Sequence, residues 1–152
     1  MKITLIAVGK LKKSPEKEIF DDYIKRLKVD FILKEVEDKK NLSGEKLKEA
    51  ESKLIKEHIP DSAVIVALDE RGKVISSRDF ADKIEKWQGE GANNLVFIIG
   101  GADGLHESIR ERADLTLSFG KLTWPHMLAR VMFSEQIYRA FSIIDSHPYH
   151  RD

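Results

Sequence analysis

The stretch Ala63-Val64-Ile65-Val66-Ala67-Leu68 is apolar at every position and leads directly into the polar segment Asp69-Glu70-Arg71-Gly72. A strand that is apolar on both faces belongs inside a parallel sheet covered by helices, because a sheet with one solvated face shows alternation instead. Residues 3–8 and 95–99 are short apolar runs of the same kind. Together these runs predict a buried, mainly parallel sheet.

Helix signals alternate with the strands along the chain. Ser14-Pro15-Glu16 has the order of an N-cap, a proline at the first helical position and an acid in the first turn. Ser43 and residues 76–79 provide further caps, the second of them a capping box. Adding strands at 31–36 and 115–119 and a last helix at 127–144 gives the order β-α-β-α-β-α-β-α-β-α. This order predicts an α/β fold with helices on both faces of the sheet.

Composition excludes several classes of protein. The chain has 152 residues, which favours a single domain over 1–152, and it has no cysteine for a disulfide scaffold or a thiolate nucleophile. No apolar run approaches the roughly 20 residues that span a bilayer, so we expect a cytoplasmic protein without a membrane segment. Lys and Arg total 26, as do Asp and Glu, and this balance argues against a sequence-independent nucleic-acid coat.

Ligands of such folds bind beyond the carboxyl ends of the strands, which are here residues 68–72, 100–104 and 119–124. Gly100, Gly101 and Gly104 follow a strand directly, so this loop either lets a ligand approach the backbone or is a plain tight turn. It lacks the G-x-G-x-x-G spacing of a dinucleotide site and the lysine of a P-loop. The segment 117–126 either wraps an aromatic ligand or is a connection anchored by its tryptophan.

The last helix, residues 127–144, carries apolar side chains around nearly its whole circumference. A helix of this kind is buried on all sides. Either its outer side meets a second copy of the chain, which we favour, or it is buried internally under the N-terminal segment. Arg130, Glu135 and Arg139 are unfavourable in that setting unless they are paired or functional.

The C-terminal tail, residues 145–152, is rich in polar, aromatic and imidazole groups. It is either a loose terminus or a binding element, since Arg, Tyr and His side chains contact bases and phosphates. Metal binding by His126, His147 and His150 is disfavoured, because no carboxylate pair accompanies them. We therefore expect no metal. The motifs G-x-S-x-G and H-E-x-x-H are absent from the sequence, which argues against a hydrolase.

Five motifs in order resemble the SPOUT-class methyltransferases, specifically the ribosomal RNA large-subunit methyltransferase H family, over essentially the whole chain. They are Leu68-Asp69-Glu70-Arg71-Gly72-Lys73, Phe97-Ile98-Ile99-Gly100-Gly101-Ala102-Asp103-Gly104, Leu117-Ser118-Phe119-Gly120-Lys121-Leu122-Thr123-Trp124-Pro125-His126, Glu135-Gln136-Ile137-Tyr138-Arg139-Ala140-Phe141-Ser142-Ile143-Ile144 and His147-Pro148-Tyr149-His150-Arg151.

The resemblance implies a C-terminal trefoil knot, over about residues 63–152, and a homodimer with its sites at the subunit interface. It also implies S-adenosylmethionine as the cofactor. By matching motif position, the cofactor contacts would be Leu68, Gly100, Phe119, Gly120, Lys121, Leu122, Thr123 and Trp124. Trp124 stands where other members often have Phe or Leu.

The implied reaction is methylation of N3 of a pseudouridine in 23S ribosomal RNA, on assembled ribosomes. The ring nitrogen must lose a proton, so a general base or water is needed. Our candidates for the base are His147, Tyr149 and His150, with Arg139 stabilising charge. Arg130 and Arg151 are expected to contact the RNA. Two alternatives stay open: a SPOUT enzyme acting on transfer RNA, and a nucleotide-binding module without catalysis.

Overall fold

The computed structural model describes residues 1–151 and contains a five-stranded sheet in which every strand pairing is parallel. The strand order across the sheet is β2-β1-β4-β3-β5. The elements are β1 (Lys2–Val8), α1 (Pro15–Lys25), β2 (Asp30–Val36), α2 (Gly44–Glu57), β3 (Val64–Lys73), α3 (Ser77–Gly89), β4 (Asn94–Ile99), α4 (Glu107–Arg112), β5 (Leu115–Leu117) and α5 (His126–Ile144). The predicted alternation of strands and helices is therefore confirmed.

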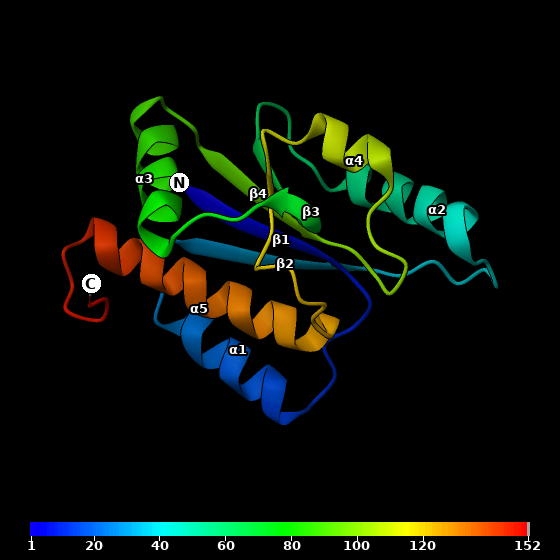
Figure 1. The fold of residues 1–152 in the computed structure, drawn as a ribbon, viewed down its shortest axis with the longest axis horizontal. Coiled ribbons are helices and arrows are strands. Elements are labelled where there is room, and N and C mark those ends of the chain that lie inside the picture. Colours follow the sequence, from blue (N-terminus) through cyan, green and yellow to red (C-terminus); the bar gives the residue numbers. More distant parts are fainter. Residues whose placement is uncertain (152) are drawn as a thin grey trace.

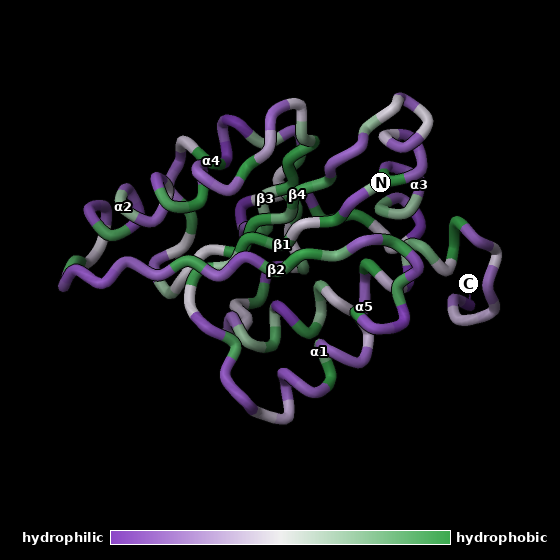
Figure 2. The backbone as a smooth tube through the Cα atoms, turned by 180° about the vertical axis from the view of Figure 1, so that it is seen from behind, coloured by the Kyte–Doolittle hydropathy of each residue, from purple (hydrophilic) through white to green (hydrophobic). Residues whose placement is uncertain are grey.

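Helices cover both faces of the sheet (Figure 1). Phe20 of α1, Phe80 of α3 and Phe133 of α5 pack in the core on one face. Ile55 of α2 and Ile109 of α4 pack in the core on the other. Figure 2 shows the hydrophobic residues concentrated in the central strands, while the helices mix both kinds of residue. The apolar runs of the sequence are thus the middle layer of a three-layer α/β/α arrangement.

The predicted caps set the helix starts with one exception. Ser14 Oγ accepts from Lys17 N at 3.2 Å, and Ser76 forms the capping box with Asp79. Ser43 occupies the N-cap position of α2, but its side chain makes no capping hydrogen bond. These short-range signals needed no tertiary information, because both partners lie within one turn.

The end of β3 differs from the prediction. The strand continues through the polar segment to Lys73, with an irregularity after Leu68, and β5 is only three residues long. Leu68 and Lys73 both pair with Leu117, and Ser118 N donates to Lys73 O at 2.9 Å. The residues between Leu68 and Lys73 therefore bulge out of the ladder, and β3 returns to pair with β5 at Lys73, a long-range pairing that the polar composition of the segment did not reveal.

Helix α5 lies on the sheet with α1 and α3 on its two flanks (Figure 1). Its buried side chains include Phe133, Ile137 and Ala140. Three neighbouring elements thus account for most of the apolar circumference within one chain, and the all-round pattern is not by itself evidence for a second subunit. No helix within residues 1–151 combines the length and apolar character needed to cross a membrane.

Candidate functional site

The carboxyl ends of β3, β4 and β5 enclose a cavity of about 480 Å³ that the start of α5 closes. A cavity of this size is in the range of small-molecule and cofactor sites. Its walls include Leu68, Gly100, Phe119, Gly120, Leu122, Thr123 and Trp124. Of the residues predicted to contact a cofactor, only Lys121 lies outside the lining, with its side chain exposed. The three strand ends chosen from the sequence therefore meet at one cavity.

The glycine loop after β4 is tightly packed. A Cβ on Gly100 would lie 2.9 Å from the carbonyl carbon of Gly104 and 3.0 Å from Leu105 N. Arg110 Nη1 donates to Leu105 O at 2.7 Å and lies 3.7 Å from Asp69 Oδ2 at the end of β3. Arg110 thereby links two of the strand ends that form the cavity, and the absence of a side chain at Gly100 lets the backbone of Gly104 and Leu105 pack against it.

The loop after β5 is held by a local turn. The buried Ser118 donates through Oγ to Gly120 O at 2.7 Å, and Gly120 N donates back to this oxygen at 3.2 Å. Gly120 has φ +113, a conformation that favours glycine. Beyond the turn, Leu122 is 71% exposed and Trp124 is 41% exposed. Large apolar side chains held at a cavity rim are suited to contact a flat ligand ring.

The charged lining of the cavity is mainly acidic. Asp69, Glu70 and Asp103 contribute carboxylates, and Arg71 contributes a guanidinium. The side chain of Asp69 is only 4% exposed, and Asp69 Oδ1 accepts from Arg71 N at 2.9 Å. A cavity with an excess of carboxylates favours a ligand that carries positive charge.

Three of the predicted catalytic residues meet around Glu135, a residue whose sequence context predicts only that its charge needs a partner. Arg139 Nε donates to Glu135 Oε1 at 2.9 Å, and Tyr149 Oη donates to the same oxygen at 3.0 Å. Arg139 Nη1 lies 3.1 Å from His150 Nδ1. The tail therefore packs against α5 and forms a defined cluster of Glu135, Arg139, Tyr149 and His150.

The other two tail residues lie outside this cluster. His147 is exposed, and its Nδ1 accepts from Tyr149 N at 3.3 Å. Arg151 is exposed at the end of the described chain. Both remain accessible to a partner.

Burial, with hydrogen bonds to Tyr23 and Glu135, raises the pKa of the Tyr149 hydroxyl above its ordinary value of 10. Tyr149 is therefore protonated at neutral pH and acts as a hydrogen-bond donor to Glu135. This state does not fit the predicted role of Tyr149 as a general base. The hydrogen bond to Glu135 likewise raises the pKa of Arg139, which stays charged. No sequence signal connected Tyr23 to this cluster, because it lies on α1 and meets the tail only in the folded chain.

The structure places Arg130, which was predicted to contact RNA, inside the protein. Arg130 is fully buried at 0% exposure. Its Nη1 donates to Glu35 Oε2 at 2.7 Å, and its Nη2 donates to Gly9 O at 2.8 Å and to Val8 O at 3.1 Å. A guanidinium occupied in this way has no surface to offer a phosphate. Arg130 instead joins the start of α5 to the ends of β1 and β2.

The cavity and the Glu135 cluster lie apart in one chain. Ala129 of α5 lines the cavity, and Arg139 is ten residues further along the helix. At 1.5 Å per residue this separation is roughly 15 Å. Figure 1 shows the tail at the end of the molecule opposite the carboxyl ends of the strands. The predicted cofactor and catalytic residues of one chain do not form a single site.

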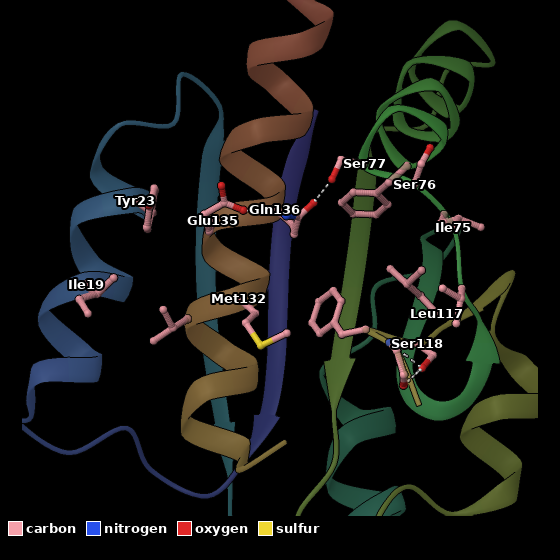
Figure 3. Close-up of a pocket in the computed structure, with 15 residues that line it drawn as sticks. Ile19, Tyr23, Ile75, Ser76, Ser77, Leu117, Ser118, Met132, Glu135 and Gln136 are labelled. Carbon is pink, nitrogen blue, oxygen red and sulfur yellow. Dashed lines mark hydrogen bonds between the residues drawn. The ribbon is translucent and has the colours of Figure 1, made fainter. Parts of the chain in front are cut away.

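A second cavity of about 480 Å³ runs between α1, α5 and the start of α3 (Figure 3). Its walls are largely apolar and include Ile19, Val74 and Met132, with Glu135 and Gln136 at one side. Ile19 is 47% exposed and Val74 is 63% exposed. The segment Leu117–Gly120 lines both cavities, so it is a shared wall between them.

In the described part of the chain, no group of three or more His, Cys, Asp and Glu residues could hold a metal ion.

Comparisons with known proteins match nearly the whole chain to methyltransferases. The family model described as "Predicted SPOUT methyltransferase" matches residues 1–150. A protein of Paramagnetospirillum magneticum named ribosomal RNA large subunit methyltransferase H is 49% identical over 99% of both chains. A protein of the same name from Rhodospirillum centenum is 48% identical over the same shares. A solved structure of a probable methylase family protein from Haemophilus influenzae has a TM-score of 0.56 at 13% identity, covering 99% of this chain and 70% of that one, which supports the fold alone.

Proposed function

Because the chain belongs to the SPOUT methyltransferase family, within the ribosomal RNA large subunit methyltransferase H group, we propose that it methylates N3 of a pseudouridine in 23S ribosomal RNA. The methyl donor is S-adenosylmethionine, and the substrate is the large subunit within assembled ribosomes in the cytoplasm. The observation that carries this proposal is the single cavity that gathers Leu68, Gly100 and the loop after β5.

The cavity fits the proposed cofactor in chemistry as well as size. When bound, S-adenosylmethionine supplies a methyl group on a positively charged sulfur. The exposed carboxylates of Glu70 and Asp103 complement that charge, whereas Asp69 is already paired with Arg71 and Arg110. The loop at Leu122–Trp124 offers exposed apolar groups for the adenine ring. No metal takes part in this proposal.

The protein's contribution to methyl transfer is mainly orientation, since nucleophile and methyl carbon must meet in line. Removal of the N3 proton requires an acceptor within hydrogen-bond reach. His147 and His150 remain our candidates. The charged Arg139 stabilises negative charge on the base, whereas Tyr149, whose hydroxyl donates to Glu135, holds the tail in place. Arg151 is available to contact phosphate.

The separation between the cavity and the Glu135 cluster supports a homodimer. A tail at the opposite end of the molecule from its own cavity completes a site only if it serves the cavity of a second subunit. We assign that contact to the second cavity, the apolar groove between α1, α5 and the start of α3. Because Leu117–Gly120 borders both the groove and the cavity, dimer formation would also stabilise the cofactor loop.

We also propose that the segment from about residue 63 to the C-terminus is knotted. The support for this proposal is the match of residues 1–150 to the SPOUT methyltransferase family model. A threaded chain is rare among proteins.

Methyl incorporation from labelled S-adenosylmethionine tests the function directly. We expect incorporation into assembled ribosomes and little into protein-free ribosomal RNA or transfer RNA. Incorporation into transfer RNA alone would show that the protein is a SPOUT enzyme acting on transfer RNA and not on ribosomal RNA. If calorimetry detects no binding of S-adenosylmethionine at sub-millimolar concentration, the proposal that the protein is a methyltransferase is wrong. If the cofactor binds but no RNA is methylated, the protein is the nucleotide-binding module without catalysis.

Mixing two inactive variants tests the shared site. Gly120→Val should strain the cofactor loop, because Gly120 has φ +113, and His147→Ala/His150→Ala removes the tail imidazoles. Each homodimer should be inactive, while co-refolded mixtures should regain about a quarter of wild-type activity, since half of the dimers are mixed and each has one intact site. No recovery in verified mixed dimers would contradict a tail that works in the partner's cavity.

A further inference from the structure

The loop between β1 and α1 presents three lysines to solvent. Lys10, Lys12 and Lys13 are exposed, and Leu11 between them is buried at 6% exposure. Many other cations of the chain are paired, for example Lys17 with Asp21 and Arg26 with Asp22. Within residues 1–151, no carboxylate forms a salt bridge with the three loop lysines. Lys10 also faces the carboxylate of Glu35, whose pKa its charge helps to lower, while Arg130 is the salt-bridge partner of that carboxylate. The loop is therefore a concentration of positive charge without salt bridges in a chain with zero net charge.

Several hydrogen bonds hold this surface loop in place. The buried Arg130 binds the carbonyl oxygens of Val8 and Gly9, and Leu11 N donates to Glu35 Oε2 at 2.5 Å. At the other end, Ser14 Oγ donates to Lys12 O at 2.9 Å. The backbone that carries the lysines is thus fixed at several points. Lysines on a fixed backbone lose less conformational freedom when they bind than lysines on a mobile loop.

The loop lies beside the proposed cofactor cavity. β1 pairs with β4, and the Val8 side chain lies 3.0 Å from the position of a Cβ on Gly101, a residue of the cavity wall. Both loops follow parallel strands and so emerge at the same edge of the sheet. In Figure 1 the loop after β1 runs next to the start of α5. A polynucleotide with one base at the cavity mouth would pass this loop.

We infer that Lys10, Lys12 and Lys13 bind phosphates of the substrate RNA next to the modified nucleotide, with Arg130 as the residue that positions them. This inference rests on the proposed function and adds a specific RNA-binding element to it. Lysine binds phosphate as a point charge, without reading the sequence. The loop therefore supplies affinity, and the shape of the folded RNA supplies selectivity.

The test replaces all three lysines by glutamine. Its control replaces Lys28, Lys53 and Lys86, which are exposed on other parts of the surface, so that both variants lose the same net charge. Both should bind S-adenosylmethionine like the wild type. For the loop variant, KM for ribosomes should rise roughly tenfold at moderate salt with kcat little changed. A plot of the logarithm of the ribosome-binding constant against the logarithm of the salt concentration should have a slope smaller in magnitude by about 2 to 3. Each lost phosphate contact contributes about 0.7 to 0.9 to that slope.

Two results would overturn the inference. One is an equal effect of the loop variant and the control variant on KM and on the salt dependence. The other is a loss of ribosome binding with no loss of binding to protein-free large-subunit RNA at low salt, which would identify an acidic protein surface as the partner. If the wild type methylates no ribosomal substrate, the proposed function fails, while RNA binding still measures the contribution of the lysines.

Discussion

Gly72→Ala is expected to destabilise the protein by about 3 kcal/mol, at the upper end of the cost of overpacking. A Cβ at this position would lie 2.6 Å from the carbonyl carbons of both Thr116 and Leu117, and 2.7 Å from Leu117 N. These are backbone atoms of β5, so no side-chain rotation relieves the clash. The end of β3 would have to separate from β5, and the bulged segment Leu68–Lys73 would loosen.

Thermal and denaturant unfolding would measure this effect. For a domain of this size, about 3 kcal/mol corresponds to a fall in Tm of roughly 6 to 12 °C. Gly89→Ala is the matched control, because Gly89 ends α3 and a Cβ there meets nothing within 4 Å. We expect that variant to be neutral or slightly stabilised. A Gly72→Ala protein as stable as the control would show that β3 and β5 separate readily.

Arg130→Met is expected to destabilise the protein by about 3 kcal/mol at neutral pH, because it leaves Glu35 without its partner. The side chain of Glu35 is 28% exposed, so water replaces part of the lost interaction. The variant also leaves the carbonyl oxygens of Val8 and Gly9 without their donor. The loop that carries Lys10, Lys12 and Lys13 should become mobile, which faster hydrogen exchange at Leu11 N would reveal.

The pH dependence of this variant separates the ion pair from simple packing. Burial alone would raise the pKa of Glu35, but hydrogen bonds from Arg130 and Leu11 N outweigh it and lower the pKa below its ordinary value of 4.5. A carboxyl with a lowered folded-state pKa contributes stability above its unfolded pKa and loses it as the pH falls through the folded value. The difference between wild type and Arg130→Met should therefore shrink in acid.

Glu35→Gln provides the control for that pH dependence. In a Glu35→Gln background, the effect of Arg130→Met should be smaller and nearly independent of pH, because no carboxylate remains to titrate. A destabilisation below about 1 kcal/mol at neutral pH for Arg130→Met alone would contradict the importance of the pair.

The sequence was sufficient for features that depend on near neighbours or on periodicity. The apolar stretches beginning at Ile3, Ala63 and Leu95 predicted buried strands, because a strand shielded on both faces has no polar side. Ser14 and Ser76 predicted helix starts, since their partners lie three residues away. The cavity could be anticipated as well, because the carboxyl ends of parallel strands meet at one edge whatever their order in the sheet.

Tertiary structure alone decided which polar groups are available. Arg130 and Arg139 look alike in the sequence, yet folding buries the first against Glu35, 95 residues away, and places the second near the tail. In the same way, Tyr149 became a donor through Glu135 and Tyr23, and Lys10, Lys12 and Lys13 became a fixed basic surface through Arg130. The alternation of strands and helices was thus determined by the sequence itself, because it follows from local hydrophobic patterning. The role of each charged group was decided only on folding, because charge depends on burial and on partners that the chain brings from far away.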